Sequence, residues 1–110
     1  MRLKVVSRFT VGAVEYAYYE GTIPEAGTLG LTISDRASII VDNSLPPAKK
    51  AAVLIHEICH AALAETPFHS IMHKMLGRDL TSEEEEALVM CLEVGLTPAL
   101  RANGFKVPKK

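Results

Sequence analysis

The residues most suited to chemistry are His56-Glu57-Ile58-Cys59-His60, a His-Glu-x-x-His pattern. The surrounding sequence predicts a helix, on which His56 and His60 project from one face with their Cβ atoms about 6 Å apart. At that separation two imidazole nitrogens can bind one zinc ion, each at about 2.0–2.1 Å. Glu57 follows His56 by about 100° around the helix axis, so it lies beside the metal and can accept a proton from metal-bound water. The pattern predicts a hydrolytic zinc site with Glu57 as the general base.

A catalytic zinc ion takes three protein ligands and keeps one open position, so a third ligand must come from elsewhere in the chain. The metzincin pattern is absent, because Leu63 and Thr66 stand where its glycine and third histidine would be. The remaining candidates are His69, His73 and the acidic run 83–86. His69 and His73 are themselves four residues apart, which keeps both open as ligands.

Helical geometry orders the four glutamates of the acidic run. With Leu92 and Leu96 at the centre of the buried face of the third helix, Glu85 lies two turns before Leu92 on the same side. Glu86 falls at the edge of that face, and the first two glutamates point sideways or away, where they would compensate the helix dipole. This geometry favours Glu85 as the third ligand, with Glu86 as the next candidate.

Cysteines and tyrosines offer weaker signals. Cys59 and Cys91 are interpreted as a buried thiol pair, with a redox switch as the alternative. Tyr16, Tyr18 and Tyr19 could each stabilise an oxyanion, but packing of strand residues against helices is the simpler interpretation. For the His-Glu-x-x-His pattern too, the simpler alternative is a buried helix whose polar side chains form ordinary hydrogen bonds.

Strand signals precede helix signals along the chain. β-Branched and aromatic residues predict strands at 3–9, 13–19 and 37–42, with a weaker one at 28–33. Helices are predicted at about 47–65, 67–76 and 81–102, the last with a Thr81–Glu84 capping box and a tail that frays beyond residue 104. The apolar face of the last helix is expected to comprise Leu88, Val89, Leu92, Leu96, Ala99 and Leu100. This order predicts an α+β fold in which a small antiparallel or mixed sheet packs on two long helices and a short one.

Composition limits the alternatives. The chain has 110 residues, of which 48% are hydrophobic and 23% charged, as expected for one domain over residues 1–110. A net charge of -1 gives no support for nucleic acid or an anionic membrane as the main partner. The start of the chain lacks the apolar centre of a secretory signal. Two cysteines suit a reducing compartment, so a cytoplasmic location is expected.

The second half of the chain resembles the minimal His-Glu-x-x-His zinc metallopeptidase-like domains of phages and prophages. The resemblance rests on the strand 38–42, a short loop, the segment 53–61 and the later acidic helix 85–103. Those domains lie in the broad neighbourhood of the ImmA/IrrE and SprT-like families. The resemblance implies a zincin-like fold, Zn²⁺ held by His56, His60 and Glu85, and Glu57 as the base. The chain lacks the Glu-x-Glu-Ala-Asn pattern of ImmA/IrrE and includes no added DNA-binding domain, so regulatory roles of longer relatives do not carry over.

The resemblance also implies a substrate-binding edge strand. In such peptidases the strand before the motif helix borders the cleft and pairs with an extended substrate, which here would be 38–42; an internal strand is the alternative. The expected function is a gluzincin-type zinc peptidase acting on a protein or peptide, in an oligomeric state left open. The competing hypothesis is a non-catalytic metal-binding module, of phage origin, that acts through protein–protein interaction.

Overall fold

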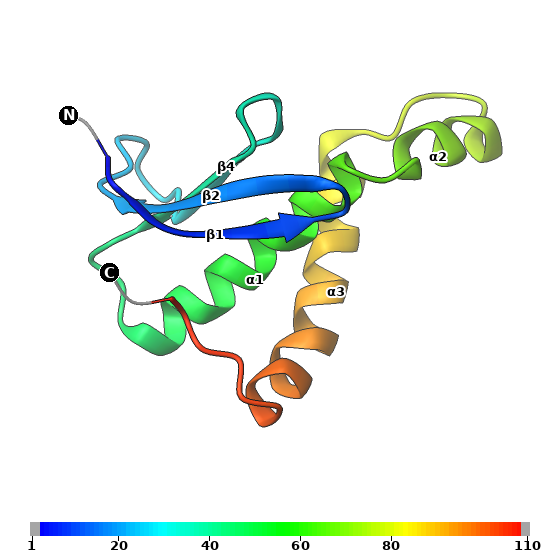
Figure 1. The fold of residues 1–110 in the computed structure, drawn as a ribbon. Coiled ribbons are helices and arrows are strands. Elements are labelled where there is room, and N and C mark those ends of the chain that lie inside the picture. Colours follow the sequence, from blue (N-terminus) through cyan, green and yellow to red (C-terminus); the bar gives the residue numbers. More distant parts are fainter. Residues whose placement is uncertain (1–2, 109–110) are drawn as a thin grey trace.

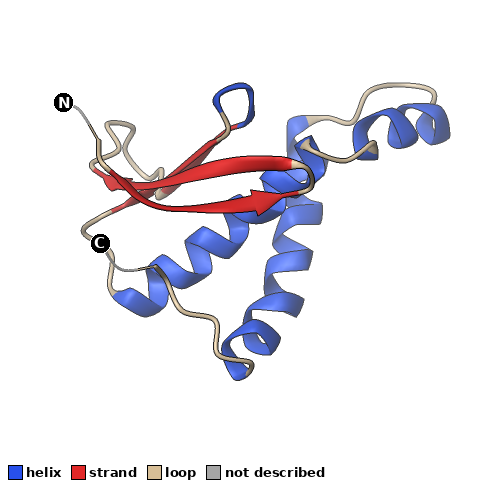
Figure 2. Cartoon of the chain, in the orientation of Figure 1, coloured by secondary structure: helices blue, strands red, loops and turns tan. Residues whose placement is uncertain are grey.

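The fold was determined from a computed structural model, which describes residues 3–108. Four strands and a short 3₁₀ turn occupy the first part of the chain, and three helices follow (Figures 1 and 2). The strands are β1 (Val5–Val11), β2 (Val14–Gly21), β3 (Gly30–Ile33) and β4 (Ser38–Asp42). The helices are α1 (Pro47–Ala64), α2 (Phe68–Leu76) and α3 (Ser82–Ala102). The α+β fold with a mixed sheet is confirmed.

The sheet has the strand order β1-β2-β4-β3. β1 and β2 form an antiparallel hairpin, β2 runs parallel to β4, and β3 pairs antiparallel with β4. β4 therefore lies inside the sheet, and the prediction that 38–42 is an edge strand is wrong. The β-branched residues identify the strand, but its interior position depends on pairing with both β2 and β3, which the local sequence does not encode. The edge nearest α1 is β3.

The main core lies between the sheet and α1. Tyr16 and Tyr18 alternate along β2, and Ile39 and Val41 along β4, so all four side chains are directed to one face and are fully buried. Leu54 of α1 is buried with them in the same cluster. Apolar packing of α1 on the sheet therefore fixes the helix that carries the histidines.

α3 packs on α1 through a much smaller apolar contact, formed by Val89 against Ile55 and Cys59. Of the apolar face predicted for this helix, only Val89 is buried. Leu92 and Leu96, expected at its centre, are each 42% exposed. α3 is thus rotated about its axis from the predicted orientation. Its glutamate side chains, and not its leucines, are directed toward α1.

The segment after α3 returns to the core instead of fraying as predicted. Phe105 is half-buried against both apolar clusters, and Val107 packs against the larger one. Lys109 and Lys110 lie outside the described residues. Within residues 3–108, no helix combines the length and apolarity that crossing a bilayer requires.

Candidate metal centre

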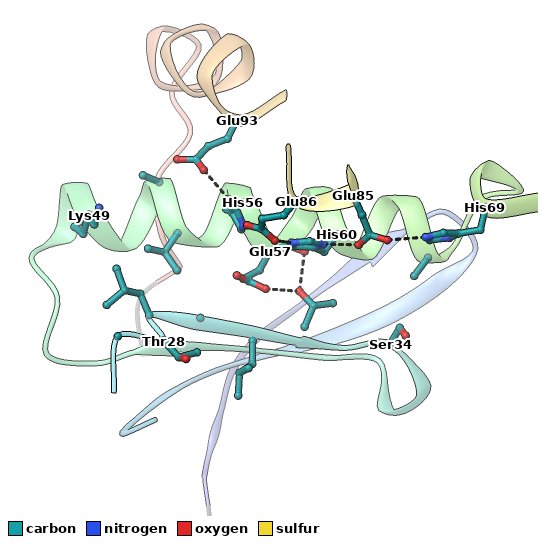
Figure 3. A pocket seen from close by; sticks show the side chains of 18 residues that line it. Thr28, Ser34, Lys49, His56, Glu57, His60, His69, Glu85, Glu86 and Glu93 are labelled. Atoms are coloured by element: carbon teal, nitrogen blue, oxygen red, sulfur yellow. Dashed lines mark hydrogen bonds and ion pairs between the residues drawn. The ribbon is translucent and has the colours of Figure 1, made fainter. Parts of the chain in front are cut away.

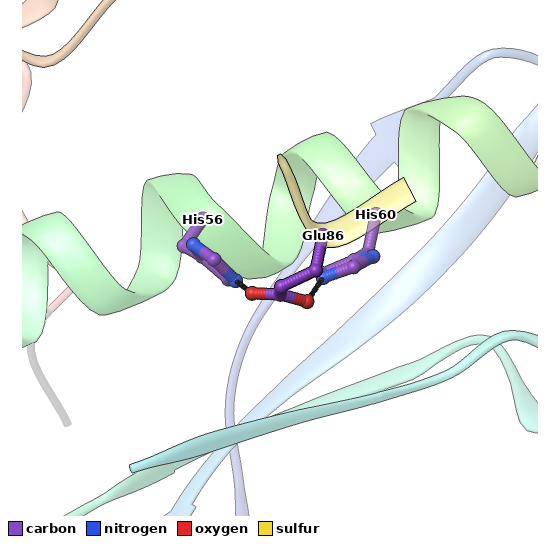
Figure 4. A group of neighbouring side chains, drawn as sticks. All are labelled: His56, His60 and Glu86. Atoms are coloured by element: carbon purple, nitrogen blue, oxygen red, sulfur yellow. Dashed lines mark hydrogen bonds and ion pairs between the residues drawn. The ribbon is translucent and has the colours of Figure 1, made fainter. Parts of the chain in front are cut away.

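His56, His60 and Glu86 form a compact group between α1 and α3 (Figure 4). The Glu86 carboxylate bridges the two rings, with Oε1 2.6 Å from His56 Nε2 and Oε2 2.9 Å from His60 Nε2. One ligand atom from each residue lies within 4.8 Å of the others. The group combines two imidazoles and one carboxylate, which is a donor set that zinc accepts.

The outer nitrogen of each ring is held by a second glutamate of α3 (Figure 3). His56 Nδ1 lies 2.7 Å from Glu93 Oε1, and His60 Nδ1 lies 2.7 Å from Glu85 Oε2. The other oxygen of Glu85 lies 2.6 Å from His69 Nε2. Carboxylates that accept the Nδ1 proton fix the ring orientation and leave Nε2 as the ligand atom, an arrangement usual around metal-bound histidines.

The proton count around these rings favours a cation at the centre. A neutral imidazole has a single N–H. If His56 and His60 each donate this proton to the outer glutamate, both Nε2 lone pairs face the acceptor oxygens of Glu86. Contacts of 2.6 and 2.9 Å between acceptors require a proton on the rings or on Glu86, or a metal ion in their place. A divalent metal is one cation that these residues fit.

The electrostatics of His56 agree with this arrangement. Burial by itself lowers the pKa of this ring, but the hydrogen bond to Glu93 and the negative charges of Glu86 and Glu57 outweigh burial and raise the pKa above the ordinary value. The pKa of Glu85 is lowered, because its contacts with His69 and His60 outweigh its partial burial. The centre therefore attracts positive charge.

Glu57 lies beside the two histidines and is only 7% exposed. The Thr32 hydroxyl lies 2.7 Å from Glu57 Oε1 and 2.9 Å from the Glu57 backbone oxygen, which holds the side chain against β3. Burial raises the pKa of Glu57, and the hydrogen bond from Thr32 partly opposes this effect. A buried carboxylate with a raised pKa is suited to proton transfer.

β3 approaches α1 closely because residue 30 is a glycine. A Cβ at Gly30 would lie 2.7 Å from Val53 Cγ1 and 3.0 Å from Glu57 Cγ. Any larger residue would push the strand away from the helix or displace Glu57. Gly30 thus sets the separation between the general-base candidate and the strand beside it.

A cleft of about 640 Å³ contains all of these groups. Loop 27–29 and β3 form one wall, α1 forms the floor, and the first half of α3 closes the other side (Figure 3). Lys49 and Glu93 line the cleft together with His69. The histidines, Glu86 and Glu57 therefore share one solvent-accessible space.

The structure brings together His56, His60 and Glu57 as the sequence predicts, but it places Glu86 rather than Glu85 between the histidines. Glu85 instead contacts the outer side of His60. His73 bonds Asp79 2.8 Å away on the exposed side of α2 and lies outside the cleft.

The tyrosines and cysteines do not join the centre. Tyr16 and Tyr18 are core residues whose hydroxyls donate to Glu65 and Glu20, and neither lines the cleft. Cys59 is buried and Cys91 is exposed, and both are free, so the predicted buried thiol pair is wrong.

Sequence reasoning missed Glu93, Thr32 and Gly30. Glu93 follows Glu86 by seven residues, and this two-turn spacing places both on one side of α3. That signal was present in the sequence, but the leucines at 88, 92 and 96 indicated a different inward face. Thr32 and Gly30 depend on the approach of β3 to α1, for which the sequence has no local signal.

Comparison with known proteins gives no relative: no family model, curated protein or solved structure is significantly similar to the chain.

Proposed function

We propose that the protein is a zinc-dependent peptidase in which His56, His60 and Glu86 hold the metal. The observation that carries the proposal is the Glu86 carboxylate bridging the two Nε2 atoms, with Glu57 beside them in the same cleft. Zn²⁺ bound there would lower the pKa of a water molecule and polarise the scissile carbonyl.

The residues of the chain have separate roles in this proposal. Glu57 accepts the proton of the attacking water and later delivers it to the leaving amine, which its raised pKa favours. Thr32 keeps the Glu57 carboxylate in position through the 2.7 Å contact. Glu93 and Glu85 orient the ligand rings by binding their Nδ1 atoms.

β3 supports recognition of an extended peptide. It is the last strand in the sheet order and forms a wall of the cleft, so within residues 3–108 its outer edge pairs with no other strand. An added peptide strand could form main-chain hydrogen bonds there, which select extended conformation more than sequence. The substrate class proposed is therefore an unfolded or flexible protein segment.

Cleavage of an unfolded protein by the zinc-loaded chain tests the proposal. Wild type should cleave a denatured test protein such as reduced casein. Glu57→Gln should bind zinc equally and lose activity by at least about 100-fold, because general base catalysis contributes 10²–10⁴-fold. Glu65→Gln is the matched control, since Glu65 follows α1 but does not line the cleft. Equal rates for wild type and Glu57→Gln would contradict the proposal.

A non-catalytic metal-binding module is the second candidate. It is favoured by the fact that carboxylates of α3 contact all four ring nitrogens of the two histidines on α1, so the group joins the two helices as a structural site would. Hydroxamate binding separates the two candidates, because it requires an open coordination position. A cobalt-loaded peptidase should change its visible spectrum on adding acetohydroxamate, whereas a closed site should not.

A further inference from the structure

Lys49 lies in the first turn of α1 and lines the same cleft as the candidate metal centre (Figure 3). It is exposed, and within residues 3–108 its side chain makes no hydrogen bond or ion pair. The next residue, Lys50, differs in both respects, because its ammonium lies 2.9 Å from Glu20 Oε1 and it does not line the cleft. Lys49 therefore gives the cleft a positive charge that the described part of the chain does not neutralise.

The other charged side chains of the cleft already have partners. Four glutamates line it, and Lys49 is the only lysine or arginine that does so within the described range 3–108. Glu57 contacts Thr32, and the other three glutamates contact histidines. Apart from a bound metal, Lys49 is thus the permanent cation that can attract a negatively charged part of a substrate.

Lys49 lies two helical turns from the first histidine, on the same side of α1. Seven positions separate it from His56, which corresponds to about 10 Å along the helix axis. An extended peptide advances about 3.3 Å per residue, so about three residues cover this distance. A peptide whose scissile bond lies at the metal centre would therefore bring a residue about three positions from that bond close to Lys49.

The course of β3 along α1 sets the direction of the peptide. A Cβ at Gly30 would lie 2.7 Å from Val53 Cγ1. Two residues later, the Thr32 hydroxyl lies 2.9 Å from the Glu57 backbone oxygen, so β3 and α1 run in the same direction along the cleft (Figure 3). Antiparallel pairs of strands are the commoner kind. A peptide added antiparallel to β3 directs its C-terminal side toward Lys49.

On the basis of the proposed peptidase function, we propose that Lys49 is a specificity-determining residue. It binds a carboxylate of the substrate about three residues to the C-terminal side of the cleaved bond. That carboxylate belongs either to an aspartate or glutamate side chain or to the end of the peptide, because a lysine ammonium recognises the charge that both share. Lys49 takes no part in the chemical step and contributes only to the choice of the bond that is cleaved.

Mapping of cleavage sites in reduced, dephosphorylated casein by mass spectrometry tests the proposal. Wild type should cleave preferentially where aspartate or glutamate stands second to fourth after the cleaved bond. Lys49→Glu should reverse this preference toward lysine and arginine at the same positions. Lys74→Glu is the matched control and should keep the wild-type preference, since Lys74 is exposed and does not line the cleft.

Synthetic peptides measure the preference and separate the two sources of the carboxylate. In an amidated peptide, glutamate in place of glutamine three residues after the cleaved bond should raise kcat/KM of wild type by about 2–5-fold, as expected for an exposed ion pair. The gain should shrink in about 1 M salt, which screens the pair. A peptide that keeps glutamine and ends there in a free carboxylate tests the chain end as the source. A gain with either peptide that Lys49→Glu abolishes supports the proposal.

Three results would overturn the proposal and leave the peptidase function in place. They are cleavage without a charge preference, a preference for acidic residues on the N-terminal side of the cleaved bond, and an equal preference in Lys49→Glu and Lys74→Glu. If zinc-loaded wild type cleaves neither casein nor any peptide, the proposed function fails and the role of Lys49 fails with it.

Discussion

Three carboxylates of α3 contact the two histidines, and their order around the rings decides which residue can bind a metal. Glu86 faces both Nε2 atoms, while Glu85 and Glu93 face one Nδ1 atom each. The sequence predicts that His56 and His60 project from one side of α1, as the structure shows, because the i, i+4 spacing has only one geometric consequence on a helix. It does not separate Glu85 from Glu86, since adjacent residues differ by only about 100° and the rotation of α3 depends on its tertiary contacts.

Removing an outer glutamate should weaken the metal centre without destroying it. Glu93→Ala should lower zinc affinity about 10–100-fold with the stoichiometry unchanged, because the His56 ring loses the acceptor for its Nδ1 proton. Competition titration with a fluorescent chelator measures the change, and the exposed Glu83→Ala is the control. An affinity equal to that of wild type would show that Glu93 does not orient the ring.

Gly30→Ala should destabilise the chain by about 1–3 kcal/mol, the usual cost of overpacking. The added methyl group would lie 2.7 Å from Val53 Cγ1. Urea unfolding of the two single variants and the double variant with Val53→Ala gives the coupling between the positions. Because Val53→Ala removes the methyl that clashes, the double variant should lose less than the sum of the single losses. Simple additivity would contradict the close approach of β3 to α1.

At the scale of elements, buried strands and a capped helix are the parts that local sequence predicts best. The Thr81–Glu84 capping box is formed as predicted, because it depends on four consecutive residues. Strand order and the inward face of α3 depend on contacts between distant segments. The run 38–42 therefore predicts a strand but not which strands pair with it. The leucines of α3 predict a contact face, but α1 does not cover that face.

β2 and the end of α1 are joined by a hydrogen bond that should respond to alkaline pH. The Tyr16 hydroxyl donates to Glu65 Oε2 at 2.7 Å. Burial, together with the bond and the charge of Glu65, raises the pKa of Tyr16 from 10.0 to about 12. Because Tyr16 holds its proton more tightly in the folded than in the unfolded protein, it contributes to the free energy of unfolding. This contribution is complete below pH 10 and is lost as pH rises through 12.

Tyr16→Phe tests this linkage. The variant should be less stable by about 1.5–3 kcal/mol at neutral pH, the usual contribution of a hydrogen bond to a charged group. Because the phenylalanine does not ionise, the difference from wild type should shrink between pH 10 and 12. Urea midpoints at several pH values measure it. A difference that is constant over this range would contradict the raised pKa.

At the scale of the whole molecule, the metal would join two parts that otherwise share little apolar contact. The sheet and α1 form one core, whereas α3 rests on α1 through the small Val89 cluster and the histidine–glutamate contacts. A ligand that binds only the folded arrangement stabilises it by mass action. Zinc should therefore protect α3 more than it protects the sheet.

Hydrogen exchange with and without metal measures this effect. Removing zinc with a chelator should accelerate amide exchange in α3 and leave β2 and β4, which are held by the main core, almost unchanged. In His56→Ala, addition of the chelator should change neither region. Uniform acceleration across the sheet and α3 in wild type would contradict a metal located between α1 and α3.

The zinc content of purified wild type, Glu86→Ala and Glu85→Ala shows whether His56, His60 and Glu86 hold a metal. Wild type should contain about one zinc per chain, as for a single three-ligand site. Glu86→Ala should lose the zinc, whereas Glu85→Ala should retain it with weaker affinity. Zinc retained in Glu86→Ala but lost in Glu85→Ala, or wild type that takes up no zinc when it is supplied, would contradict a metal held by these three residues.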